Sequence, residues 1–349
     1  ALTDTTAGGN ISLNAGQDII QSANISANTS AKTIDLVAGR NITQAQTYST
    51  TSTNGNILLQ AGNNITMETL SAGSGNISVT ATAGNIIDSD ANGDSEIDIT
   101  AAGLKLTAGT GIGSGSNHIE TTVSTLTASA GAGGLFVIES DGVIVDTLQI
   151  NVNRVDATAA AAATTYNAQE DLKTSSNGSI VLVTTNGSIT LNDGTAAADN
   201  TAVSANGSGN ILIEALNAGT DITANADIKS GSGHITVMAA QTVSFNATAD
   251  ITTGGTGTIY VEGTSGNVTQ ADDSRFTAVS GDIRVVAGST INLGGVTTNV
   301  NASLIAGTGS ILDSGSAFGG EDVIADTLRM TAGTGIGTSG DHIETKVGT

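Results

Sequence analysis

Short runs of alternating apolar and polar residues recur along the whole chain, and each run is bounded by Gly, Asn or Ser. The recurring unit is G-N-I-x-Φ-x-A, where Φ is an aliphatic residue. It occurs as GNISLNA at 9–15, GNILLQA at 55–61, GNISVTA at 75–81 and GNILIEA at 209–215. Alternation with a period of two, followed by turn residues, predicts short β-strands separated by tight turns.

The spacing of these units predicts how the strands are stacked. Units begin at equal steps at positions 209, 233, 257 and 281, and a slightly shorter step runs from 55 to 75. A repeat this short cannot bury its apolar face alone, so it must stack on its neighbours. Helical periodicity is confined to the run at 156–172, which argues against leucine-rich repeats. We therefore predict an all-β parallel β-helix, or β-solenoid, with coils of about 20–24 residues and roughly 16 coils. The run at 156–172 is predicted to be a loop or a short helix that leaves the coils.

A second, longer repeat divides the chain into copies. Residues 107–123 read TAGTGIGSGSNHIETTV and residues 331–347 read TAGTGIGTSGDHIETKV, an offset of 224. We predict a first copy of a long module at 1–125, a part unique to one module at 126–230, and a second, partial copy at 231–349.

Composition supports a stacked β structure. The chain of 349 residues has 46 Gly, no Pro and no Trp, and only 2% of its residues are aromatic. Proline cannot donate to a β ladder, whereas Gly and Asn accept the positive φ angles of tight turns. The repeat is already present at 9–15, which predicts that the chain is a segment of a longer protein.

Charge and cysteine content limit the partners and the compartment. The formal net charge is −22, which opposes binding to nucleic acid or to anionic membrane surfaces. No run of about 20 apolar residues is present, so we predict no membrane insertion. The chain has no Cys and therefore no disulfides, a composition compatible with a bacterial secreted protein.

The duplicated segment carries a His–Glu pair in each copy, His118 with Glu120 and His342 with Glu344. Residues i and i+2 share one face of a strand, so each pair could touch. A protein metal site usually needs three or four donors, and no further His or Cys accompanies either pair. We interpret both pairs as parts of a duplicated coil. His234 occupies the Asn position of a G-N-I turn, which is also a structural location.

One acidic segment is a candidate calcium loop. Residues 88–98 read DSDANGDSEID, with oxygen-bearing side chains at alternate positions, as at the start of an EF-hand-type loop. The candidate ligands are Asp88, Asp90, Asn92, Asp94 and Glu96. The twelfth position is Ile99, where that loop requires Glu, and the matching segment DSGSAFGGEDV at 313–323 has lost most of the carboxylates. The alternative is a solvated acidic loop. No cofactor is otherwise required.

The sequence contains no pattern for catalysis. Enzymes built on β-helices cleave polysaccharides with clustered carboxylates, often assisted by Arg or Lys. The arginines of this chain are far apart in sequence, at Arg40, Arg154, Arg275, Arg284 and Arg329. We predict that the protein is not an enzyme.

Tandem G-N-I-x-Φ-x-A-G units, with T-A-G-T-G-I-G segments recurring in long modules, resemble the repeat region of large bacterial exoproteins. These are the filamentous-haemagglutinin-like adhesins exported by two-partner secretion. The resemblance implies a right-handed parallel β-helix, export across an outer membrane, and a secreted or cell-surface location. The family's N-terminal secretion domain carries an Asn-Pro-rich signature, and this chain has no Pro. The resemblance is therefore to the shaft alone.

These observations predict an extracellular structural rod, the shaft or repeat segment of a giant surface adhesin, with Asn ladders joining neighbouring coils. One alternative is a filament or sheath subunit, because no capping segment covers the strand edges and chains could stack end to end. Another is a carbohydrate- or ice-binding face made of Thr rows. The expected partners are further copies of the chain, end to end or side by side, and glycans or proteins of a host or neighbouring cell surface.

Overall fold

The computed structural model describes residues 2–4, 9–90, 96–315 and 320–348. The described chain contains no helix and forms a parallel β-solenoid of about 14 turns, which confirms the predicted fold class. Its contacts divide it into two compact units, Ala1–Glu170 (unit 1) and Asp171–Thr349 (unit 2). This is a division by packing, and the boundaries of the sequence copies at 125 and 230 remain a prediction.

The number of turns is lower than roughly 16 because some residues lie outside the repeating coil. The coil that begins at Ile180 reaches the same position again only at Ile211, a longer step than the next one, from Ile211 to Ile235. The segment that contains β18 (Asn151–Val155) and β19 (Ala161–Thr165) forms a separate two-stranded sheet.

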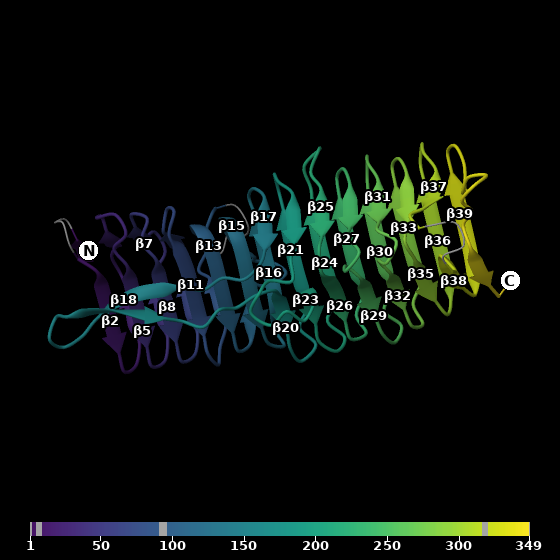
Figure 1. Ribbon diagram of the computed structural model, residues 1–349. Coiled ribbons are helices and arrows are strands. Elements are labelled where there is room, and N and C mark those ends of the chain that lie inside the picture. The colour runs from purple at the N-terminus through teal and green to yellow at the C-terminus, as the bar shows by residue number, and fades with distance from the viewer. Residues whose placement is uncertain (1, 5–8, 91–95, 316–319, 349) are drawn as a thin grey trace. The chain divides into compact units, whose positions relative to one another are not determined.

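In unit 1, each coil contributes strands to three parallel rows (Figure 1). The third-row strands run on into the first row in two places, at β13 (Ile99–Ala108) and β15 (Ile119–Ala130), and β17 (Val143–Val145) pairs with Thr125 and Leu126 in the middle of β15. The first row contains β2 (Ile11–Ala15), β5 (Ile34–Ala38), β8 (Ile57–Ala61), β11 (Asn76–Ala81), β13 (Ile99–Ala108) and β15 (Ile119–Ala130). The second contains β3 (Ile19–Gln21), β6 (Ile42–Gln44), β9 (Ile65–Met67), β12 (Ile86–Asp88), β14 (Gly111–Ile112) and β16 (Gly134–Glu139). The third contains β1 (Leu2–Asp4), β4 (Ile25–Ala27), β7 (Ser49–Ser52) and β10 (Thr69–Ser71).

Unit 2 repeats the three-row arrangement (Figure 1). Its first row contains β21 (Ile180–Thr184), β24 (Ile211–Ala215), β27 (Ile235–Ala239), β30 (Ile259–Gly263), β33 (Ile283–Ala287), β36 (Asn301–Ala306) and β39 (Thr327–Ala332). The second contains β22 (Ile189–Leu191), β25 (Ile222–Ala224), β28 (Val243–Phe245), β31 (Val268–Gln270), β34 (Ile291–Leu293) and β37 (Ile311–Asp313). The third contains β20 (Leu172–Thr174), β23 (Thr201–Ala205), β26 (Asp227–Ser230), β29 (Ile251–Thr253), β32 (Phe276–Ala278), β35 (Val296–Thr298), β38 (Val323–Ala325) and β40 (Thr345–Val347).

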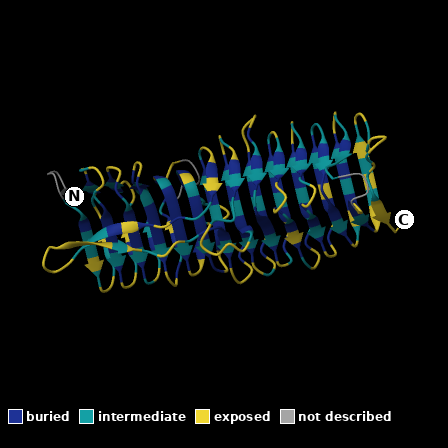
Figure 2. Ribbon diagram, viewed as in Figure 1, coloured by how far each residue is buried: buried dark blue, intermediate teal, exposed yellow. Residues whose placement is uncertain are grey.

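The core of each unit is a set of aliphatic ladders. The equal steps between repeats place Ile211, Ile235, Ile259 and Ile283 in register on consecutive first-row strands, as predicted. All four side chains are buried, and Figure 2 shows buried residues along the strands and exposed residues along the turns. Because alternate residues of a strand point to opposite faces, every coil adds the same inward-facing positions to the core.

Asparagine and aspartate side chains connect successive coils of unit 1, as the repeated G-N-I turn predicts. Asp18 Oδ1 accepts a hydrogen bond from the backbone N–H of Asn41 at 3.1 Å. Asn41 Oδ1 accepts from the N–H of Asn64 at 3.1 Å, and Asn64 Oδ1 accepts from the N–H of Asn85 at 2.9 Å. These residues lie before the second-row strands, where a backbone N–H at the corner would otherwise lack a ladder partner.

Part of the segment predicted to be a loop or a short helix lies in a β-hairpin, in which residues 156–165 form the turn and the second strand. β18 and β19 pair antiparallel from Asn151–Thr165 to Val155–Ala161. At the turn, Asp156 Oδ1 accepts hydrogen bonds from the N–H groups of Thr158 and Ala160 at 2.8 and 3.0 Å. The helix prediction is wrong because this Asp side chain closes a tight turn that brings the Ala- and Thr-containing arm β19 into register with β18.

The hairpin folds back onto the first coils of unit 1 rather than projecting from them (Figure 1). The Arg154 guanidinium binds both carboxylate oxygens of Asp35 on β5, at 2.7 and 3.2 Å. The N–H of Asn153 donates to Thr33 Oγ1 at 2.8 Å, and the N–H of Val155 donates to Ser12 Oγ at 3.1 Å. These contacts fasten the hairpin to residues that lie far away in the sequence.

Candidate metal centre

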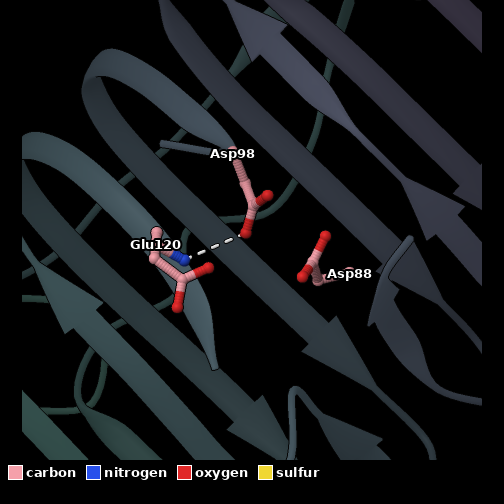
Figure 3. Close-up of side chains that lie close together, drawn as sticks. All are labelled: Asp88, Asp98 and Glu120. Atoms are coloured by element: carbon pink, nitrogen blue, oxygen red, sulfur yellow. Dashed lines mark hydrogen bonds between the residues drawn. The ribbon is translucent and has the colours of Figure 1, made fainter. Parts of the chain in front are cut away.

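Unit 1 contains a group of three carboxylates that converge inside the solenoid. One carboxylate oxygen from each of Asp88, Asp98 and Glu120 lies within 4.8 Å of the other two. The residues are 4%, 1% and 3% exposed, respectively. Figure 3 shows the three side chains pointing toward one another from separate parts of the chain. We call this group the first cluster.

Strand stacking brings these residues together. Asp88 is the last residue of β12, Asp98 directly precedes β13, and Glu120 lies near the start of β15. β13 and β15 are neighbouring parallel strands, with Ile99 opposite Thr121. Asp98 Oδ2 therefore accepts the backbone N–H of Glu120 at 3.0 Å, while the N–H of Asp98 donates to the Glu120 carbonyl at 2.9 Å. One oxygen of Asp88, Oδ1, accepts the N–H of Asp90 at 3.1 Å.

Unit 2 contains a second cluster built from the equivalent residues of the module copy. One oxygen from each of Asp313, Asp322 and Glu344 lies within 4.8 Å of the other two. Asp322 Oδ2 accepts the backbone N–H of Glu344 at 2.8 Å, and the N–H of Asp322 donates to the Glu344 carbonyl at 2.8 Å. Asp313 Oδ1 accepts the N–H of Gly315 at 2.8 Å, as Asp88 accepts from Asp90. The local hydrogen bonding is thus the same in both clusters.

Burial and mutual repulsion act on the central aspartate of each cluster. Burial, together with the nearby carboxylates of Asp88 and Glu120, raises the pKa of Asp98 to about 10. In unit 2 burial and the carboxylates of Asp313 and Glu344 raise the pKa of Asp322 to about 7. The increase is smaller for Asp322 because its cluster is less deeply buried. Without a compensating positive charge, each cluster favours protonation of its central carboxyl group.

Oxygen atoms without a hydrogen-bond partner among the described residues lie in both clusters. In the first, Asp88 Oδ2 is such an atom, and in the second Glu344 Oε2 is. A neighbouring residue adds one more in each copy, Asn117 Oδ1 in unit 1 and Asp341 Oδ1 in unit 2. Asn117 and Asp341 occupy equivalent positions of the two copies, each directly before the duplicated His. Both copies therefore carry, at this position, a buried side-chain oxygen without a partner in the described part of the chain.

The structure distributes the predicted calcium-loop residues differently from the EF-hand pattern. Asp88 belongs to the first cluster, Asp90 is buried beside it with its N–H bound to Asp88, and Glu96 is exposed. Asn92 and Asp94 lie outside the described residues. Whether the five alternate positions form a calcium loop therefore stays a prediction, and the described residues bring Asp88 together with Asp98 and Glu120 instead.

The histidines lie outside the two groups of three carboxylates. The His118 ring meets the ring of Phe136 edge-on, with centroids 6.0 Å apart. His342 is exposed in the matching turn. His234 takes the ladder role of the Asn that it replaces, because its Nδ1 accepts the N–H of Thr258 at 3.2 Å and lies 2.8 Å from Thr258 Oγ1. In the duplicated His–Glu pairs, the Glu is therefore the residue that joins a cluster.

Sequence reasoning missed the grouping of Asp98 and Glu120 with Asp88, although the sequence contained a signal for it. The three carboxylates recur at offsets of 225, 224 and 224, as Asp313, Asp322 and Glu344. Aligning the two copies position by position and keeping only the shared acidic residues would have selected all six.

No protein-family model matches the chain, and no curated protein or solved structure matches it significantly. Among the residues that the structure describes, no helix has the length and apolar character needed to cross a membrane. The interpretation of the two clusters therefore depends on their geometry.

Proposed function

We propose that this chain is a structural segment from the shaft of a large bacterial surface adhesin of the filamentous-haemagglutinin-like type, secreted and held at the cell surface. The chain is a repeat protein built as a β-solenoid, which is the architecture that a shaft segment requires. The adhesin assignment is supported by the tandem G-N-I units and the T-A-G-T-G-I-G segments.

The observation that carries the proposal is the unbroken register of the first row in unit 2. Ile180 pairs with Ile211, and the same position continues through Ile235, Ile259 and Ile283. Each coil is bonded to the coil before it and the coil after it, so that a coil can be added without altering any other. Length then grows by about 4.8 Å per coil, the spacing between neighbouring strands. Such an architecture serves as a spacer.

The proposal includes no catalytic activity. A polysaccharide substrate needs carboxylates that it can reach, on an exposed face. The acidic residues of the first cluster are buried between coils, and none of them is more than 4% exposed. In this position the three carboxylates can affect how the coils stack, but they are not accessible to a polysaccharide.

The proposed partners are further copies of the chain and the glycans or proteins of a host or neighbouring cell surface. A flat Thr-lined face for carbohydrate or ice is less well supported. In the third row of unit 2, Thr252, Thr277 and Thr297 are in register, but the column continues with Lys229 on one side and Ile324 on the other. A lattice-matching surface would need a longer uniform column.

Lengthening unit 2 tests the spacer role. A second copy of residues 211–282, which is three whole coils, is inserted after residue 282, so that Ile283 stays in register. Small-angle scattering and electron microscopy should show folded, elongated particles whose maximum dimension grows by about 14 Å, three strand spacings. The matched control is an inserted copy of residues 211–270, which ends in mid-coil and should disrupt the stack.

Each result of this experiment has a clear meaning. Lengthening with the whole-coil insert and disruption with the partial one support the spacer. Compact particles that do not lengthen contradict it. Long uniform fibres of the unaltered chain would instead support the filament or sheath subunit.

A further inference from the structure

We propose that each carboxylate cluster binds one calcium ion and that the ion clamps neighbouring coils together. The ligands are Asp88, Asp98 and Glu120 in unit 1, and Asp313, Asp322 and Glu344 in unit 2. This inference goes beyond the structural role proposed above and does not depend on it, because a solenoid of any function could be stabilised in this way.

The donors and their separations favour calcium. All three donors of each cluster are carboxylates, the ligands of hard cations, and nitrogen or sulfur donors do not belong to either group of three. Separations of at most 4.8 Å allow one ion to contact all three oxygens, since calcium–oxygen distances are about 2.3–2.6 Å. Three protein carboxylates around one ion favour calcium over magnesium, because magnesium usually retains several waters and takes only one or two carboxylates.

A second observation, independent of the acidic composition, points to a ligand. Asp88 is 4% exposed, and its Oδ2 atom has no hydrogen-bond partner among the described residues. Figure 3 shows this carboxylate directed at Asp98 and Glu120. A buried carboxylate oxygen without a donor is costly, and a cation between the three groups would satisfy it. In unit 2, Glu344 Oε2 likewise has no hydrogen-bond partner among the described residues, and a cation would satisfy it.

The duplication supports the same conclusion. Between the two copies, the acidic segment changed from DSDANGDSEID to DSGSAFGGEDV, with loss of the carboxylates at the positions of Asp90 and Asp94. The carboxylates at the positions of Asp88, Asp98 and Glu120 are present in both copies and converge in both. Repulsion alone would disfavour this arrangement at two separate places.

The first cluster adjoins a pocket, and a bound ion would have a defined mechanical effect there. Asp88 lines a pocket of about 210 Å³ together with Asn85, Ile87, Gly113, Ser114 and Asn117. The ion would join the end of β12 to the start of β13 and to β15 in the next coil. It would thus tie both ends of the segment between Asp88 and Asp98 to the stack.

The test counts ions on the intact chain. Equilibrium dialysis against calcium, with elemental analysis and about 150 mM KCl to screen surface charge, should give about two calcium ions per chain at concentrations near about 1 mM. Asp98→Asn and Asp322→Asn should each lower this number to about one, and the double variant to about zero. Asn keeps an oxygen that can accept the N–H of Glu120 or Glu344 but removes the charge. Glu214→Gln, a half-buried carboxylate of β24 outside both clusters, is the matched control and should still bind two.

Thermal unfolding gives a second readout. The unfolding temperature of the unaltered chain should be higher in calcium than in EGTA, and this difference should disappear in the double variant. Absence of bound calcium and of any calcium-dependent shift in the natively folded, unaltered chain would overturn the proposal, and this measurement requires no variant to fold. Equal binding of magnesium at the same concentration would overturn the assignment to calcium.

Discussion

Replacing Gly39 with Ala tests how closely the coils are stacked. Gly39 follows the first-row strand β5, and its N–H donates to the carbonyl of Ala15 in the preceding coil at 2.8 Å. A Cβ atom at Gly39 would lie 2.3 Å from the carbonyl oxygen of Gly16 and 2.9 Å from its carbonyl carbon. Both are backbone atoms that cannot rotate away, so the two coils must separate locally.

The cost follows from the geometry. Forcing a methyl group against the backbone of the adjacent coil costs about 1–3 kcal/mol, the range found for overpacking. The same displacement weakens the hydrogen bond from Gly39 to Ala15 and the neighbouring one from the N–H of Arg40 to the Gln17 carbonyl, also 2.8 Å. At about 0.5–1.5 kcal/mol each, the total loss in the free energy of unfolding is about 2–6 kcal/mol.

Gly16→Ala is the matched control, because Gly16 occupies the same turn position one coil earlier. Nothing lies within 4 Å of a Cβ placed there. This change should be neutral, or should stabilise by up to about 1 kcal/mol through the unfolded chain. Urea unfolding followed by far-ultraviolet circular dichroism measures both variants, and hydrogen exchange at the amides of Gly39 and Arg40 locates the effect. Equal stability of the two variants within about 0.5 kcal/mol would refute the close-stacking argument.

Three further predictions concern other contacts. Burial raises the pKa of Glu139 from 4.5 to about 7, so this group stabilises the fold by about 3 kcal/mol below about pH 4.5, and that stabilisation is lost as the pH rises to about 7. Glu139→Gln should remove this part of the pH dependence of the free energy of unfolding in urea, and an unchanged pH dependence would contradict the prediction. Arg154→Met leaves the carboxylate of Asp35, 2% exposed, without its cation, and should lower the free energy of unfolding by about 1–2 kcal/mol after allowance for the partly exposed Arg. Limited proteolysis should then cut the released β18–β19 hairpin first, and protection equal to that of the unaltered chain would argue against the Arg154–Asp35 contact as its fastening. Asn64→Ala removes the acceptor for the N–H of Asn85 and should cost about 1 kcal/mol in urea unfolding, whereas no change would mean that water replaces the ladder bond.

The hairpin shows where local sequence patterns misled. The run of Ala around residues 158–163 has high intrinsic helix propensity, yet its residues form the turn and the start of the second strand of a hairpin. Asp156 closes the turn, and the contact between Arg154 and Asp35 holds the arm against β5. A contact between residues so far apart in the chain has no signature in the local pattern, so tertiary packing overrides propensity here.

The two clusters show a related limit. Sequence analysis selected Asp88 and its alternate neighbours because a calcium loop draws its ligands from closely spaced positions. In the structure the partners of Asp88 are Asp98 and Glu120, neither of which was among the five candidate ligands. Their convergence depends on the length of each coil, which decides which side chains of adjacent coils meet at a corner.

The sequence by itself determined the all-β class, the parallel stacking, the register of Ile211, Ile235 and Ile259, and the role of Asn at the turns. These properties follow from a period of two, from turn residues and from the repeat length, all of which are local or periodic. Only the tertiary structure decided where the hairpin lies and which carboxylates share a buried site. The hairpin depends on contacts with coils far away in the sequence, and the clusters depend on which side chains of adjacent coils meet at a corner. Stacking at strand spacing brings both sets of residues together, and neither grouping is written in the local pattern.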